Sequence, residues 1–311
     1  MIRKMVNVKK FERNKGIGVK CIFKIFIVTL LISVLVMECS RKSNLDSKDK
    51  ITVAVSILPL VDFTREIGGE RVNVEALIQP GYSPHTYEPT VSQLETVSKS
   101  KVLVLNGIGL EFWAEDMINA SNNSNLIVIR TAEGLEIIEE HNEGGGNPHI
   151  WLDPIYAKYQ VEKIKEALID VDPEGSEFYE NNAERYLKQL DLLDEEIKER
   201  ISKFSFKKFI SFHGAFSYFA KRYGLEEAAV IEKTPGAEPS PAEIARIINL
   251  VRSFGAKAIF AEPQFPSKPA KVIAEESGAK VIYLNPLGLP PDYKYIDLMR
   301  YNIAQLEKAL L

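Results

Sequence analysis

Short β-rich apolar runs alternate with amphipathic segments along most of this chain. The runs predict strands at 51–57, 72–78, 101–106, 126–130, 208–212, 228–231, 256–261 and 279–284. Apolar residues at helical spacing predict helices at 90–98, 111–120, 154–169, 215–223, 241–254, 269–277 and 293–311. Strands that alternate with helices are typical of parallel βα units. We therefore expect an α/β fold with parallel-rich sheets.

One amphipathic segment is much longer than the others. Residues 176–204 contain no proline or glycine, and their apolar positions recur at helical spacing. A helix of this length is expected to connect two α/β lobes. The predicted organisation is a signal or anchor segment at 1–39, a polar tether at 40–50, an N-terminal lobe at 51–173, a linking helix at 174–204 and a C-terminal lobe at 205–311.

The N-terminal segment indicates export from the cytoplasm. Residues 1–24 carry eight lysines and arginines against one acid, and residues 25–37 are thirteen uncharged, mostly apolar residues. That length fits a secretory signal and is shorter than the roughly 20 residues of a spanning helix. Cys39 follows, as in a lipoprotein signal, but Glu38 stands where a small residue is expected. Either a lipid on Cys39 or an uncleaved anchor would hold the body at the outer face of the membrane.

Charge and cysteine content narrow the function. The net charge is −4 and the first 24 residues contribute +7, so the remainder carries −11. An acidic body lacks the basic face that nucleic-acid binding needs. The only cysteines are Cys21 and Cys39, both in the N-terminal segment. The body therefore has no disulfide framework and no thiolate metal site, and a metal site there would use histidines and carboxylates.

Three of the four histidines lie in turns marked by proline or glycine. His149 comes 64 residues after His85, and His213 comes 64 residues after His149. His213 and Glu262 each directly follow a predicted strand. Ligands of α/β folds bind beyond the carboxyl ends of strands. Imidazole is the commonest protein ligand for zinc, and three imidazoles leave one position of a tetrahedral site open. The pattern predicts a metal site assembled from distant segments.

Five motifs surround or accompany these residues. They are Pro80-Gly81-x-Ser83-Pro84-His85-x-Tyr87-Glu88-Pro89, Asn147-Pro148-His149-Ile150-Trp151-Leu152-Asp153-Pro154, Ser211-Phe212-His213-Gly214-Ala215-Phe216, Pro235-Gly236-Ala237-Glu238-Pro239 and Ala261-Glu262-Pro263-Gln264-Phe265. Together they resemble the zinc/manganese group (cluster A-I) of solute-binding proteins that serve ABC importers. The resemblance covers residues 51–311. It implies two lobes joined by a long rigid helix, limited lobe motion, and a metal bound between the lobes by His85, His149 and His213.

The sequence offers several candidates for the fourth metal ligand. The resemblance places Asn285 where the family often has an acid, and an amide oxygen is a weaker zinc ligand than a carboxylate. A water or a nearby acid is the alternative, with Glu262 either a ligand or an acceptor that orients a histidine. Three imidazoles favour Zn2+ over Mn2+, which prefers oxygen-rich sites.

Other polar residues near the motifs have structural interpretations. Asp153 and Glu88 each adjoin a proline and are expected to brace loops, or to contact a metal ligand from behind. His141 lies in the glycine-rich acidic loop 138–147 and either collects cations weakly or belongs to a solvated turn.

The predicted function is a monomeric extracytoplasmic zinc receptor that delivers metal to a membrane-bound ABC permease and catalyses no reaction. A manganese receptor of the same family is the first alternative. A secreted zinc hydrolase and a surface adhesin are the alternatives from other classes, although the chain has no His-Glu-x-x-His helix. Because metal binding needs neutral imidazoles, affinity is expected to fall as the pH drops through roughly 6.5.

Overall fold

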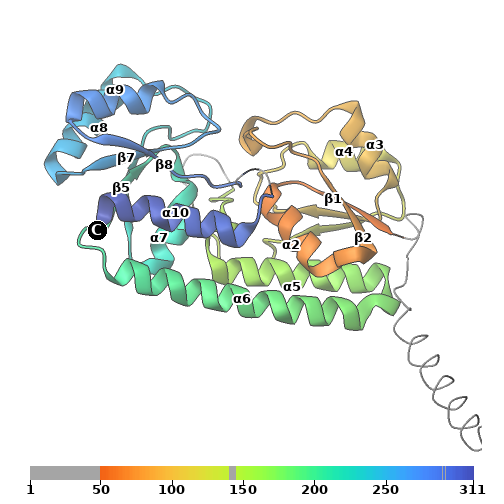
Figure 1. The fold of residues 1–311 in the computed structure, drawn as a ribbon. Helices are drawn as coiled ribbons and strands as arrows, with labels where there is room; N and C mark the ends of the chain where they lie inside the picture. Colours follow the sequence, from red (N-terminus) through yellow and green to blue (C-terminus); the bar gives the residue numbers. More distant parts are fainter. Residues whose placement is uncertain (1–49, 140–144, 289, 291) are drawn as a thin grey trace, which may run out of the picture. The chain divides into compact units, whose positions relative to one another are not determined.

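Strands and helices alternate through the computed structural model, which describes residues 50–139, 145–288, 290 and 292–311. Cys39, the rest of the signal segment and His141 lie outside these residues. Residues Ser47–Leu311 form one compact unit, in which two α/β lobes rest on a pair of long helices (Figure 1). Among the described residues, no helix combines the length and apolar character needed to cross a bilayer.

The first lobe is built on a four-stranded parallel sheet. The strands are β1 (Ile51–Val55), β2 (Val72–Ala76), β3 (Val102–Leu105) and β4 (Ile127–Arg130), in the order β2-β1-β3-β4. All residues of β3 are buried, as are the last three of β1, which explains their continuous apolar sequences. The helices of this lobe are α2 (Leu58–Gly68), α3 (Val91–Lys99) and α4 (Ala114–Ser121).

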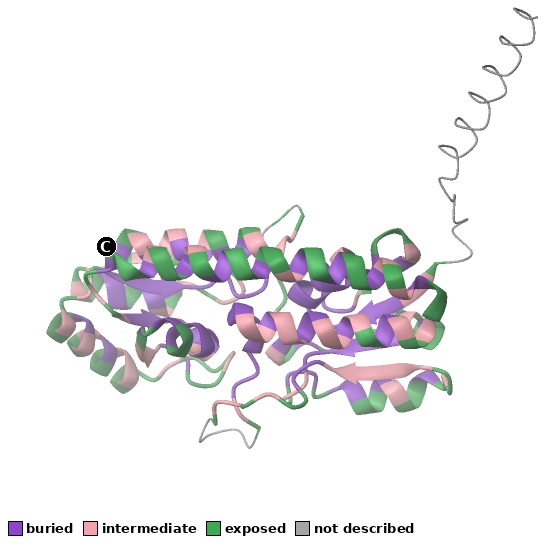
Figure 2. Cartoon of the chain, turned by 90° about the horizontal axis from the view of Figure 1, so that it is seen from below, coloured by how far each residue is buried: buried purple, intermediate pink, exposed green. Residues whose placement is uncertain are grey.

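Two long helices, α5 (Pro154–Val171) and α6 (Ser176–Ser202), lie side by side below the lobes (Figure 1). The side chain of Asp153 caps α5 by accepting from the backbone N–H of Ile155. The 27 residues of α6 bury one stripe, which includes Tyr186 and Leu190, and expose the opposite face (Figure 2). In the described chain α6 contacts α2 of the first lobe and α10 (Tyr295–Leu310) at the second.

The second lobe contains two parallel strand pairs. β5 (Lys208–Ser211) pairs with β6 (Glu226–Val230), β7 (Ala258–Ala261) pairs with β8 (Lys280–Tyr283), and β5 lies against β7. Its helices are α7 (Ser217–Tyr223), α8 (Pro241–Phe254) and α9 (Lys268–Ser277), followed by α10. A capping box between Ser240 and Glu243, with a proline in the first turn, sets the start of α8.

Helix α2 is the main departure from the elements that the sequence predicts. Its residues are buried on nearly every side, so the polar stripe that marks an amphipathic helix is missing. The sequence signal for this helix is the proline in its first turn, a few residues after β1. The structure also has five short 3-10 turns, η1 (Gly69–Arg71), η2 (Pro84–Thr86), η3 (Ile150–Leu152), η4 (Pro173–Gly175) and η5 (Gly214–Phe216).

Buried hydrogen bonds tie the two lobes together near the middle of the unit. The indole N–H of Trp151 donates to the carbonyl of Pro286 over 2.7 Å, and the hydroxyl of Tyr295 donates to the carbonyl of Trp151 over 2.7 Å. Asp62 on α2 accepts from the backbone N–H of Tyr295 and from the hydroxyl of Tyr186. These bonds fix the segments that carry the candidate site residues.

Candidate metal centre

Three short turns bring the predicted histidines together. His85 lies in η2, in the loop after β2. His149 occupies the N-cap position of η3, just ahead of α5, and His213 lies two residues after the end of β5, at the N-cap position of η5. The proline before His85 and the one before His149 limit the backbone of their turns. Segments from both lobes therefore meet at one point, beyond the carboxyl ends of parallel strands.

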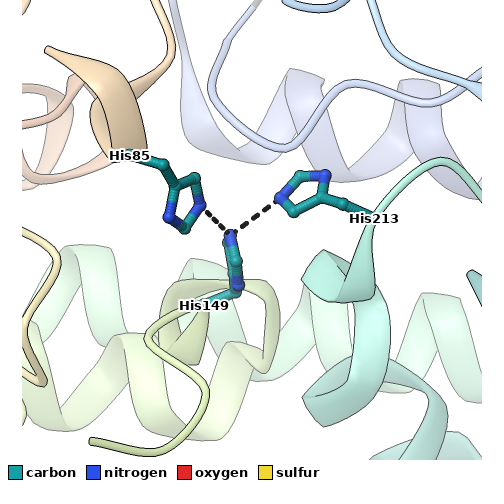
Figure 3. A group of neighbouring side chains, drawn as sticks. All are labelled: His85, His149 and His213. Atoms are coloured by element: carbon teal, nitrogen blue, oxygen red, sulfur yellow. Dashed lines mark hydrogen bonds between the residues drawn. The ribbon is translucent and has the colours of Figure 1, made fainter. Parts of the chain in front are cut away.

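The three imidazole rings point at one another (Figure 3). The Nε2 atom of His149 lies 3.0 Å from Nε2 of His85 and 3.1 Å from Nε2 of His213, and one nitrogen of each ring lies within 4.8 Å of the other two. Tetrahedral zinc at 2.0–2.1 Å from its ligands separates them by roughly 3.3–3.4 Å. An outward shift of a few tenths of an ångström would fit the rings to that geometry.

The protonated nitrogen of His149 is fixed by Asn147. The side-chain oxygen of Asn147 accepts from the backbone N–H of His149 over 3.0 Å, so this atom is an acceptor. The same oxygen lies 2.9 Å from Nδ1 of His149, which must therefore be the N–H donor of the ring. In the neutral ring Nε2 then carries a lone pair, the form that binds a metal.

His213 is oriented in the same way by Glu262. An oxygen of Glu262 lies 2.7 Å from Nδ1 of His213 and also accepts from the backbone N–H of His213 over 3.3 Å. The proton of the neutral ring is thus held on Nδ1, and Nε2 is free of a proton. Glu262 directly follows β7 and is 1% exposed. The described structure therefore uses Glu262 as an acceptor behind a histidine.

Burial keeps His85 and His149 neutral. Desolvation, and next the charge of His213, lowers the pKa of His85 to about 3. Burial, followed by the charges of His213 and His85, lowers the pKa of His149 well below its ordinary value. Burial also raises the pKa of the nearby Glu227 carboxyl to about 7, although the hydroxyls of Ser211 and Ser217 donate to it. Near neutral pH the rings of His85 and His149 can therefore offer lone pairs to a cation.

The rings separate two small cavities. One has a volume of about 10 Å³ and is lined by the three histidines together with Ser83, Glu262 and Gln264, among others. The other has a volume of about 90 Å³ and extends past Gly109, Gly146 and Lys233. The smaller cavity has room for a single guest the size of a water molecule.

The remaining predicted residues lie further from the rings. Asn285 follows β8, is buried, and lines neither cavity. The carboxylate of Asp153 forms a bidentate ion pair with Arg222 on α7, with N–O distances of 2.7–2.9 Å. Glu88 is exposed. Asp153 thus braces two helices against each other.

Several residues that shape this centre have roles that were not predicted from the sequence. Asn147 and Gln264 were part of the quoted motifs, but only their partners in the fold show what they do. The two-residue spacing between Asn147 and His149 is the typical arrangement for a side-chain amide that bonds to nearby backbone, and it was the available signal. Arg222 and Glu227 had no local signal, since their contacts are made in three dimensions.

Comparison with known proteins agrees with this architecture. The sequence model of the family described as "Zinc-uptake complex component A periplasmic" matches residues 53–309. The high-affinity zinc uptake system protein ZnuA of Bacillus subtilis is 31% identical over 292 residues, which cover 88% of this chain and 92% of that protein. The manganese-binding lipoprotein MntA of Halalkalibacterium halodurans is 29% identical over 294 residues, covering 91% of this chain and 97% of that protein.

A crystal structure of ZnuA has the same fold, with a TM-score of 0.78 and 32% sequence identity, over 84% of this chain and 99% of that one. The region matched by the family model, residues 53–309, contains all three histidine turns. The chain therefore belongs to the zinc-uptake complex component A family.

Proposed function

We propose that this chain is an extracytoplasmic receptor that binds one divalent metal ion through His85, His149 and His213 and delivers it to an ABC permease. One observation carries the proposal. The Nε2 atom of His149 lies 3.0 Å from Nε2 of His85 and 3.1 Å from Nε2 of His213, so one nitrogen of each ring points to a common place. The Nδ1 atoms of His149 and His213 each face an oxygen, which leaves their Nε2 atoms placed to bind one cation together.

Zinc is the ion that this set of donors supports best. Three neutral imidazoles suit zinc, whereas manganese prefers oxygen ligands. The zinc-uptake relative from Bacillus subtilis supports the same choice. The manganese-binding relative makes manganese the alternative cargo of the same receptor.

The size of the cavities supports a receptor that carries out no reaction. Three imidazoles and an open position are also found in zinc hydrolases. A hydrolase must seat its substrate against the metal, and the two cavities that border the rings, of about 10 and 90 Å³, are both far smaller than the roughly 300–1,000 Å³ of a typical ligand pocket. Zinc-loaded protein should therefore leave ester and peptide substrates intact.

The placement outside the cytoplasm rests on the N-terminal sequence. The basic start and the apolar stretch at 25–37 support export, and Cys39 supports a lipid anchor on the outer face of the membrane. Lobes at 51–173 and 205–311, linked by 174–204, would then face the permease.

The experiment is a competition titration of zinc against a chelator for the unmodified protein, His213→Ala and the control His141→Ala. His141 is the one histidine outside the group of three. His213→Ala should lose more affinity than the roughly 10–100-fold that loss of a ligand's hydrogen-bond partner costs. His141→Ala should bind like the unmodified protein. Unchanged binding by His213→Ala would rule out the three-histidine site.

A further inference from the structure

Unpaired oxygen atoms gather beside the three imidazoles. Ser83 Oγ, Glu262 Oε2 and Gln264 Oε1 are buried and have no hydrogen-bond partner in the described part of the chain, where only six such side-chain atoms occur. All three residues line the cavity of about 10 Å³ that the histidines line. Buried polar atoms in folded proteins are nearly always paired. This clustering indicates that a guest in the cavity contacts one or more of these oxygens.

Asn285 is not available to that guest, because its side chain is fully engaged. Its oxygen accepts from the backbone N–H groups of Leu287 and Gly288 over 3.0 and 3.2 Å, and its amide nitrogen donates to the carbonyl of Gly288 over 2.6 Å. Backbone N–H groups can only donate, so the orientation of this amide is determined. Asn285 therefore braces the loop after β8.

The same oxygen of Asn285 determines the orientation of Gln264. It lies 2.9 Å from the side-chain nitrogen of Gln264, and because it is an acceptor, its partner must be the NH2 group. The carboxamide oxygen of Gln264 is then the end that makes no bond to Asn285. This is the buried, unpaired Oε1 atom of a residue that lines the histidine cavity.

Carboxylates do not fill the fourth position in this arrangement. No carboxylate oxygen of the described residues joins the three imidazole nitrogens within 4.8 Å. One oxygen of Glu262 is already occupied by the ring N–H and backbone N–H of His213. Moving this carboxylate onto the metal would release the ring that it orients.

We propose that Gln264 supplies the fourth, neutral ligand through Oε1, and that Asn285 is a positioning residue that holds the amide of Gln264 in this orientation. The proposal rests on the proposed function. It makes the site a set of three nitrogens and one uncharged oxygen, poorer in oxygen and negative charge than a site completed by an acid. Such a set disfavours manganese.

The test compares zinc and manganese affinities of Gln264→Glu, Gln264→Leu and Asn285→Asp by chelator competition. Gln264→Glu should bind both metals more tightly, with the larger gain for manganese, and Gln264→Leu should lose on the order of tenfold in zinc affinity. Asn285→Asp keeps the acceptor and should show no gain. The proposal is overturned if both Gln264 variants bind like the unmodified protein, or if Asn285→Asp gains affinity while Gln264→Glu does not.

A spectroscopic readout separates ligation from general loss of structure. The visible absorption of the cobalt(II)-loaded protein reports the ligands of the metal, and it should change in Gln264→Leu and Gln264→Glu, and also in Asn285→Ala, which removes the partner of the Gln264 amide. An unaltered spectrum in the two Gln264 variants would exclude direct ligation. His213→Ala distinguishes the two proposals. If His213→Ala binds zinc as tightly as the unmodified protein, the three-histidine site is wrong. If His213→Ala loses zinc binding while the Gln264 variants bind like the unmodified protein, only the assignment of the fourth ligand is wrong.

Discussion

Single residues set the protonation state of this centre before any metal arrives. Asn147 and Glu262 each place an oxygen beside Nδ1 of one ring, so His149 and His213 turn their Nε2 atoms toward each other. His85 differs, since it is half-buried and its Nε2 atom lies 3.0 Å from Nε2 of His149. Affinity should therefore depend on acceptors that never touch the metal.

Asn147→Ala should lower zinc affinity by about 10–100-fold, because Nδ1 of His149 loses the acceptor that fixes its proton. Chelator competition at neutral pH measures the loss. The matched control is Asn73→Ala, an exposed asparagine of β2 that bonds to Glu75. Equal affinities for the two variants would contradict this role for Asn147.

The pH dependence of binding should differ from the sequence-based expectation of a fall through roughly pH 6.5. The pKa of His85 is lowered to about 3, mainly by burial. Protons at His85 should therefore hardly compete with zinc between about pH 7.5 and pH 5.5. Zinc titrations over this range, corrected for the chelator, should give a nearly constant affinity. A tenfold loss per pH unit through this range would contradict it.

The lowered pKa of His85 makes the stability of the metal-free protein depend on pH. The pKa of His85 is about 3 in the folded chain and near 6.5 when unfolded. Between these values the unfolded chain binds more protons than the folded one. The free energy of unfolding should then fall as the pH drops from about 6.5 toward 3.

At the scale of elements, two turns act as one piece. The amide of Asn147 donates to the carbonyl of Gly214 over 2.6 Å, the hydroxyl of Tyr218 donates to the carbonyl of Asn147, and Asp153 pairs with Arg222. These contacts join the segment that carries His149 to the segment that carries His213, across the two lobes. His85 comes from a separate turn, so it completes a pair that is already held in place.

Arg222→Ala should lower the free energy of unfolding by about 1–3 kcal/mol, because Asp153 is 4% exposed and loses a bidentate partner. Lys221→Ala on the same helix removes only an exposed pair with Glu136 and should cost between 0 and about 1 kcal/mol. Urea unfolding of the metal-free proteins measures both. Equal losses of stability for the two variants would contradict a stabilising role for the Asp153–Arg222 ion pair.

Most elements could be predicted from local pattern because their burial follows it. The strand β3 is apolar throughout and β1 is apolar except at Thr52, and α6 and α8 carry one buried stripe each. Helix α2 could not be found this way, since it is buried on almost every side. The three histidines were identified from their turns. Gln264 and Arg222 could not be assigned, because their roles depend on partners distant in sequence.

At the scale of the whole described unit, the lobes are tied at several points. Trp151 bonds to Pro286 and Tyr295, Asp62 bonds to the start of α10, and α6 contacts helices of both lobes. A wide opening would break these buried bonds. We therefore expect only local movement when the metal is released. The turn that carries His85 is the part expected to move, because it is held separately from the other two histidines. Small-angle scattering should give superimposable curves with and without zinc, and a clear compaction on zinc binding would contradict this.

The central claim is that three imidazoles from distant segments bind one ion. X-ray absorption at the zinc edge, on protein loaded with one equivalent of zinc, tests it most directly because it counts the ligands of the metal itself. We expect three imidazoles and one oxygen at about 2.0–2.1 Å from the zinc. A spectrum with one imidazole or none, and a shell made of oxygens, would contradict it.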